Sequence, residues 1–166
     1  MSEKRKNIIF YVLAGLIGLM AVHWVKTAQD DMMKILLYPH TAAVMLFYNI
    51  PMIYHEGVGY VSIDYTFAIG SACMGSHFML MLFGMNVCMF VKYFKGFYKG
   101  AWFAISFMGA IFIGILMSII RIISSLPFVA YEKFALVHVG IGVMVYFFAL
   151  LMCYITAKKL VGRNET

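Results

Sequence analysis

Long apolar stretches separated by short polar ones dominate the chain. Four stretches are long enough to cross a bilayer core of about 30 Å as helices that rise about 1.5 Å per residue. They cover approximately residues 8–25, 73–93, 101–124 and 134–157. The pattern therefore predicts an all-α integral membrane protein with about four transmembrane helices, the first of which is retained and not a cleaved signal peptide.

A fifth apolar stretch, residues 32–50, is less suited to crossing because Lys34, Pro39 and His40 interrupt it. If it crossed completely, the chain would have to return to the outer face before Cys73, and the intervening residues are too polar for a clean span. We therefore expect a re-entrant or interfacial helical segment at 32–50, with a complete crossing as the alternative.

The residues that follow predict a short β-hairpin on the outer face. Met52–His55 and Tyr60–Tyr65 are rich in β-forming residues, and Glu56–Gly59 supplies the turn between them. Backbone of this kind is tolerated at membrane depth where it packs on protein or lines a wet cavity, which points to a site nearby.

We interpret residues 1–166 as a single membrane-embedded domain without repeats or linkers. It consists of the first helix, a re-entrant segment and hairpin at 32–72, and a three-helix core at 73–157. The third helix carries small residues at every fourth position, which predicts close packing against a neighbour. These residues are Ser106, Ala110, Gly114 and Ser118.

Composition and charge agree with a membrane location. The chain is 64% hydrophobic and 12% charged, whereas soluble domains carry about 25% charged residues. Basic residues cluster before the first helix, at 92–99 and after the fourth helix, and acidic residues lie in the other connections. The positive-inside rule then predicts a multi-pass plasma-membrane protein with cytoplasmic N- and C-termini. Because topology accounts for the net charge of +6, no nucleic-acid partner is expected.

Three polar residues fall at the outer end of three different apolar segments in this topology: Cys73, Arg121 and His138. A thiol can act as a nucleophile, a guanidinium can stabilise an oxyanion, and an imidazole can transfer protons. Cys73 is expected at the start of its helix, where the helix dipole favours a thiolate. His77, one turn later on the same predicted helical face, is an alternative partner to His138.

The other candidate sites are weaker. Cys88 and Cys153 lie inside apolar runs, where cysteine is an ordinary packing residue. The sequence contains no Cys-x-x-Cys or His-Glu-x-x-His motif, so we expect neither a metal nor a cofactor.

Three local motifs resemble the exosortase/archaeosortase family of membrane-embedded cysteine transpeptidases, and the small exosortase K type in particular. Ala72-Cys73-Met74-Gly75 is similar to the family's Ala-Cys-Ser-Gly, and Ser118-Ile119-Ile120-Arg121-Ile122 is similar to its Asn-x-x-Arg-Ile. His138 near the start of the following helix is the third motif. Met74 and Ser118 depart from the usual serine and asparagine.

The resemblance implies a transpeptidase or protease that processes C-terminal sorting signals at the extracytoplasmic face through a thioester on Cys73. Arg121 and His138 would complete the catalytic set, with His77 and Ser118 as auxiliary residues. The implied partners are membrane lipids and secreted proteins whose C-terminal tail has a recognition motif, a transmembrane helix and a basic cluster.

Two other functions remain open on the sequence. One is a non-enzymatic membrane scaffold. The other is a redox protein that binds haem or quinone, in which His23, His77 and His138 near the outer face would serve as ligands.

Overall fold

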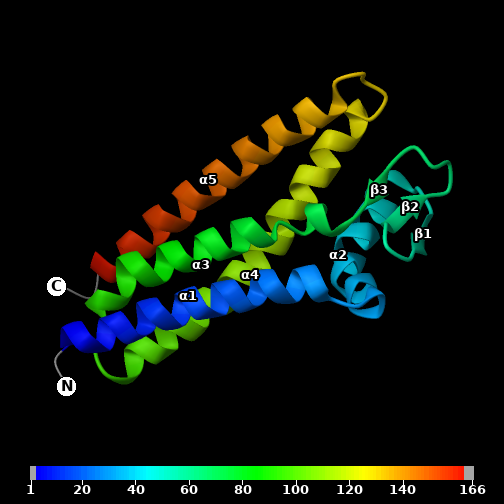
Figure 1. Cartoon of the computed structure of the whole chain (residues 1–166). Helices are drawn as coiled ribbons and strands as arrows, with labels where there is room; N and C mark the ends of the chain where they lie inside the picture. The colour runs from blue at the N-terminus through cyan, green and yellow to red at the C-terminus, as the bar shows by residue number, and fades with distance from the viewer. Residues whose placement is uncertain (1–2, 163–166) are drawn as a thin grey trace.

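The computed structural model describes residues 3–162, and its main feature is a bundle of long helices with a small β-sheet at one end (Figure 1). Within these residues, four helical segments are long and apolar enough to cross a membrane, as the sequence predicts. They contain α1 (Glu3–Thr27), α3 (Ser76–Phe90), α4 (Phe97–Ser125) and α5 (Phe134–Gly162). Three of these helices extend further than expected, by up to about a turn at their ends.

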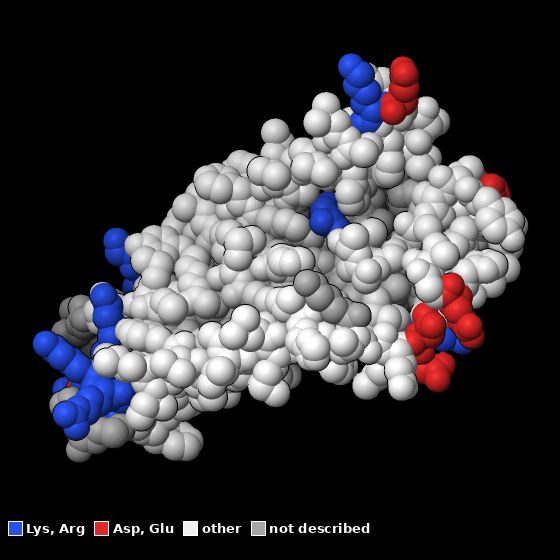
Figure 2. All heavy atoms as spheres, viewed as in Figure 1, with Lys and Arg blue, Asp and Glu red and all other residues white. Residues whose placement is uncertain are grey.

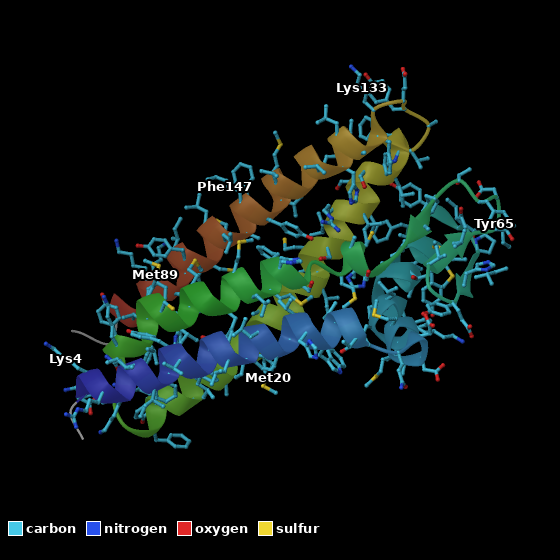
Figure 3. All side chains as sticks on the ribbon, viewed as in Figure 1. Lys4, Met20, Tyr65, Met89, Lys133 and Phe147 are labelled. Atoms are coloured by element: carbon cyan, nitrogen blue, oxygen red, sulfur yellow. The ribbon has the colours of Figure 1, made fainter. Side chains whose placement is uncertain are left out.

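The outer surface of the bundle suits a lipid environment. Met20 and Phe147 point away from neighbouring helices (Figure 3), with 71% and 61% of their surface exposed. Charged side chains gather at the two ends of the molecule (Figure 2). Basic groups lie where α1 begins and α5 ends, and acidic groups lie at the end that carries the sheet. This separation is the arrangement expected of a multi-pass membrane protein.

Close contact between α4 and its neighbours depends on the predicted stripe of small residues. All four side-chain positions of the stripe, Ser106, Ala110, Gly114 and Ser118, are buried. A Cβ atom added at Gly114 would overlap the side chain of Met79 on α3, so only glycine allows this approach. The small-residue packing face predicted from the sequence is therefore confirmed.

At the end where α1 begins, a buried lysine joins two helices. Lys99 is 1% exposed, and its Nζ donates to Glu3 Oε2 at 2.7 Å and to Asn7 Oδ1 at 2.5 Å. The buried Lys99 ammonium is thus paired with the Glu3 carboxylate, and this pair holds the start of α4 against α1.

The segment predicted as re-entrant or interfacial forms a continuous helix, α2 (Asp30–Tyr48), which is not one of the four potential spans. It lies across the sheet-bearing end of the bundle (Figure 1). One face is buried against the bundle, through Leu37, His40, Thr41 and Val44. Asn49, in the left-handed conformation with φ 54°, ends the helix and turns the chain toward the sheet.

The predicted hairpin is present, and it belongs to a three-stranded antiparallel sheet with the order β1-β2-β3. Its strands are β1 (Met52–His55), β2 (Gly59–Ser62) and β3 (Ala68–Ile69). The second strand ends three residues earlier than expected because Asp64 Oδ1 accepts hydrogen bonds from the backbone N–H and hydroxyl of Thr66. This local turn returns the chain to pair as β3, which the sequence did not predict.

The sheet is fastened to the start of α2. Asp30 Oδ1 accepts a hydrogen bond from the Gly57 backbone N–H at 2.9 Å, and the Tyr54 hydroxyl donates to the Asp30 carbonyl at 2.9 Å. Tyr60 and Ile69 are buried with Leu37 of α2 in one apolar cluster. The sheet therefore fixes the point from which the chain enters the Cys73 region.

The expectation that Cys73 begins the second helix is wrong. Cys73 lies in a separate 3-10 turn, η1 (Ser71–Met74), and Gly75 interrupts the chain with φ 67° before α3 begins at Ser76. The same helical segment ends in a second 3-10 turn, η2 (Val91–Tyr93). A left-handed residue cannot continue a right-handed helix, which is why one apolar run becomes a turn followed by a helix.

Candidate functional site

The turn that carries Cys73 is bonded to α4 on both sides of the cysteine. Arg121 Nη2 donates to the carbonyl of Ala72 at 3.2 Å, and the Ser118 hydroxyl donates to the carbonyl of Met74 at 3.2 Å. Ser118 and Arg121 are three residues apart and so lie on adjacent positions of one helical face. The two peptide carbonyls that flank Cys73 are therefore held by one helix.

Gly75 makes this arrangement possible. Its positive φ favours glycine, and a Cβ at this position would overlap Ser118 Oγ and approach Tyr146 Oη to 2.8 Å. Ser118 Oγ also lies 3.1 Å from Tyr146 Oη. Because Ser118 donates its hydrogen to Met74, the Tyr146 hydroxyl is the donor to Ser118. A chain of two hydrogen bonds thus links α5 to the cysteine turn through α4.

The Arg121 guanidinium lies between the turn and α5 with most of its donors unused. Its Cζ is 5.3 Å from the centroid of the Tyr146 ring, within range of a cation–π contact. Its Nε is buried and has no hydrogen-bond partner among the described residues. The salt bridges found in residues 3–162 involve Glu3 with Lys6 and Lys99 and do not include Arg121. The site therefore presents an uncompensated positive charge with free donors.

Because Gly142 of α5 has no side chain, the Arg121 side chain can lie directly against the helix at this position. A Cβ added at Gly142 would lie 2.8 Å from Arg121 Cδ. His138, Gly142 and Tyr146 recur every four residues and so share one face of α5. This face meets the face of α4 that carries Arg121.

His138 is oriented by a serine on α4. Its Nδ1 lies 2.8 Å from Ser125 Oγ, and Ser125 Oγ donates to the carbonyl of Ile122 at 3.0 Å. A hydroxyl has one hydrogen, so when that hydrogen is on the Ile122 carbonyl, Ser125 accepts from His138 and Nδ1 carries the proton. The basic nitrogen of the neutral imidazole is then Nε2, the one available for proton transfer.

A groove of about 410 Å³ adjoins these residues. Its lining includes Ser71, Ala72, Ser76, His77, Arg121 and Tyr146. Neither Cys73 nor His138 is among its lining residues; the half-buried Cys73 side chain packs against the apolar cluster of α2 and the sheet. The Cys73 thiol forms no hydrogen bond with Arg121 or His138 among the described residues. The structure thus brings the three predicted residues to one end of the bundle and joins them through Ala72 and Ser125, not by direct contact.

His77 differs from its predicted position relative to Cys73. The prediction placed the two residues one turn apart on the same helical face, but Gly75 breaks the helix between them. His77 is exposed and lines the groove. Cys73 also does not occupy the helix N-terminus at which the sequence placed it, because it precedes the first residue of α3 by three positions.

Sequence reasoning missed two residues of the site, Ser125 and Tyr146. The sequence spacing of both residues relative to the predicted site residues was a usable signal. Ser125 lies four residues after Arg121 and seven after Ser118, positions that share a helical face, and Tyr146 lies eight residues after His138. In an apolar segment, a polar residue in phase with a candidate site is the signal that would have identified them.

Among residues 3–162, no group of three histidine, cysteine or acidic side chains is arranged to hold a metal ion. Comparison of the chain with protein-family models, curated proteins and solved structures gives no significant match. Function must therefore be inferred from the geometry of the site and from the motifs in the sequence.

Proposed function

We propose that the protein is a membrane-embedded cysteine transpeptidase or protease of the exosortase/archaeosortase type. The observation that carries this proposal is the anchoring of both carbonyls flanking Cys73 by Ser118 and Arg121. This anchoring gives the cysteine turn a fixed place beside a guanidinium with free donors and a groove of about 410 Å³. Preorganised charge next to a nucleophile is the arrangement that acyl-transfer chemistry requires.

In the first step, the Cys73 thiolate attacks the scissile carbonyl carbon of a bound polypeptide, and a C–S bond forms. The carbonyl oxygen gains negative charge. Arg121 is suited to stabilise it because its guanidinium carries a permanent charge and no carboxylate among the described residues neutralises it. Removal of one such donor typically costs about 10²–10³ in kcat.

His138 transfers the protons. With Nδ1–H directed at Ser125, Nε2 accepts the thiol proton and later donates it to the leaving amine as the C–N bond breaks. The products are a free amine and a thioester on Cys73. An acceptor amine, hydroxyl or water then attacks the thioester; its proton passes to His138 Nε2 and from there to the released thiolate, which restores the Cys73 thiol. Ser125 acts through His138 and is therefore a positioning residue.

The substrates we propose are secreted proteins whose C-terminal tail contains a recognition motif, a transmembrane helix and a basic cluster. The apolar helix would lie beside the bundle, with its basic cluster at the basic end seen in Figure 2. The recognition motif would then lie at the sheet-bearing end, next to the groove. This placement puts the active site at the extracytoplasmic face and the termini in the cytoplasm.

The proposal is tested by comparing the C-termini of secreted proteins from cells with the wild-type protein and cells with Cys73→Ala. We expect at least one secreted protein with such a tail to keep its C-terminal apolar helix in the variant, detected by mass spectrometry of C-terminal peptides. Cys153→Ala is the matched control, and processing should continue. Arg121→Lys, which keeps the charge but loses the planar fork, should reduce processing strongly.

Identical C-termini in wild-type and Cys73→Ala cells would contradict the proposal, provided that the variant reaches the membrane in normal amounts. A scaffold would tolerate the replacement of Cys73 and of Arg121, so the two variants together separate an enzyme from a structural protein.

A further inference from the structure

A second histidine, His40 on α2, is buried without serving the site described above. It is 1% exposed, and neither ring nitrogen has a hydrogen-bond partner among the described residues. The carbonyl of Leu36, one turn earlier on α2, is near the ring but does not meet hydrogen-bond geometry. A buried imidazole without a well-formed hydrogen bond carries a desolvation cost, so its retention requires an explanation.

His40 lines a cavity different from the groove at Arg121. This second cavity, which we call the His40 groove, has a volume of about 260 Å³ and lies between α1, α2, α3 and α4. Its polar lining consists of Trp24, His40 and Ser76, and the other lining side chains are apolar. Trp24 is 45% exposed, so the groove extends to the lipid-facing surface.

The residues that line the His40 groove limit the kind of molecule that could bind there. A buried water needs two to four polar partners, and this lining is almost wholly apolar; apolar cavities of about 150 Å³ take up benzene. The lining has no charged side chain, and burial together with the nearby Arg121 charge lowers the pKa of His40. The imidazole is therefore neutral at pH 7 and offers an anionic headgroup no opposite charge.

We propose that the His40 groove binds a single-chain membrane alcohol, with its hydroxyl hydrogen-bonded to His40 and its alkyl or prenyl chain against the apolar lining. A hydroxyl suits either ring nitrogen, since it can donate to the bare nitrogen or accept from the protonated one. A carbonyl could pair only with the protonated nitrogen. A volume of 260 Å³ holds a hydroxyl and part of one chain but not a diacyl lipid.

The His40 groove adjoins the cysteine turn, as the Arg121 groove does. Met74 and Ser76, the neighbours of Gly75, both line it, and Ser76 also lines the groove at Arg121. An alcohol bound at His40 thus contacts the residues on either side of the glycine break. Binding at His40 does not require the proposed chemistry of Cys73.

Trp24 provides an internal probe for the experiment. The chain has two tryptophans, and Trp102 lies toward the opposite end of the bundle, near Phe90 and Phe94. With Trp102→Phe, the fluorescence of purified protein in detergent micelles reports on Trp24 alone. The probe is octadecanol brominated in its chain, whose bromines quench tryptophan on contact, and brominated octadecane without the hydroxyl is the comparison.

We expect saturable quenching by the brominated alcohol and a dissociation constant raised about five- to tenfold by His40→Leu, which corresponds to one hydrogen bond. His40→Asn, which keeps a donor and an acceptor, should restore part of the affinity. The brominated alkane should bind more weakly and respond equally in all variants. Ala110→Leu, which fills the groove and leaves His40 in place, should abolish saturable quenching.

The inference is overturned if the alcohol and the alkane quench equally, if His40→Leu leaves the alcohol affinity unchanged, or if quenching rises linearly with the brominated fraction of the micelle. Melting curves of each variant show whether it is folded. The same titration with Cys73→Ala should give the wild-type affinity. A failed transpeptidase proposal would therefore leave this result unaffected, and the reverse also holds.

Discussion

The most direct test of the cysteine turn is Gly75→Ala, because its cost can be assembled from the structure. Gly75 has φ 67°, and the left-handed conformation costs a residue with a Cβ about 1–2 kcal/mol. The new methyl group would also overlap Ser118 Oγ and displace its hydrogen bond to the Met74 carbonyl. A buried carbonyl that loses its partner adds about 1–3 kcal/mol.

We therefore expect Gly75→Ala to lower the free energy of unfolding by about 2–4 kcal/mol, below the maximum of the summed terms because hydrogen bonds in membranes are worth less than the largest values. The measurement is reversible unfolding in mixed micelles with increasing sodium dodecyl sulfate. Gly109→Ala is the matched control, since nothing lies within 4 Å of a Cβ there. In a helix this control should be neutral or stabilise by up to about 1 kcal/mol.

A double-mutant cycle separates the two contributions to the Gly75→Ala cost. In a Ser118→Ala background the overlap with the Ser118 hydroxyl is gone and the Tyr146 hydroxyl is free to move away from the new methyl group, so Gly75→Ala should cost mainly the conformational strain of about 1–2 kcal/mol. A cost below about 0.5 kcal/mol in the wild-type background, or equal costs in both backgrounds, would refute the role assigned to Gly75 and Ser118 in the turn.

Two further substitutions test other contacts. Gly142→Ala should displace the Arg121 side chain and reduce processing far more than thermal stability, whereas Gly140→Ala, with nothing within 4 Å, should change neither; equal effects of the two on processing would contradict this. Lys99→Met should leave the melting temperature nearly unchanged because a similar apolar chain replaces the buried one, whereas Glu3→Gln should lower it by leaving the buried ammonium without its carboxylate. The reverse order of melting temperatures would contradict the assignment of Glu3 as the partner of Lys99.

The sequence was informative where a single physical preference dominates. Four spans follow from the length of the apolar runs, and the packing face of α4 follows from the four-residue period of its small residues. The position of Cys73 was predicted wrongly because it depends on contacts between distant parts of the chain. Residues 73 to 93 form one mainly apolar run without proline, so the break depends on one glycine, Gly75, whose close neighbours Ser118 and Tyr146 come from distant parts of the chain.

The β-sheet was likewise predicted only in part. The β-forming residues near Met52 and Tyr60 predicted a hairpin, but strand β3 depends on the Asp64 turn and on pairing of Tyr60 with Ile69. In the sequence, His40 is only a polar interruption of the apolar stretch 32–50, because one histidine in such a segment carries no spacing signal. Its burial comes from how α2 lies on the bundle, which no local pattern specifies.

The contacts of α4 explain how the site keeps its geometry in an apolar solvent. Lipid chains are as apolar as leucine, so burial of apolar side chains gives membrane helices little preference for one register over another. Within two turns of α4, Ser118, Arg121 and Ser125 bind the Met74 carbonyl, the Ala72 carbonyl and His138 respectively. A slip of α4 by one turn, about 5.4 Å, would break all three contacts together. The separation of Cys73 and His138 is therefore set by a helix to which neither residue belongs.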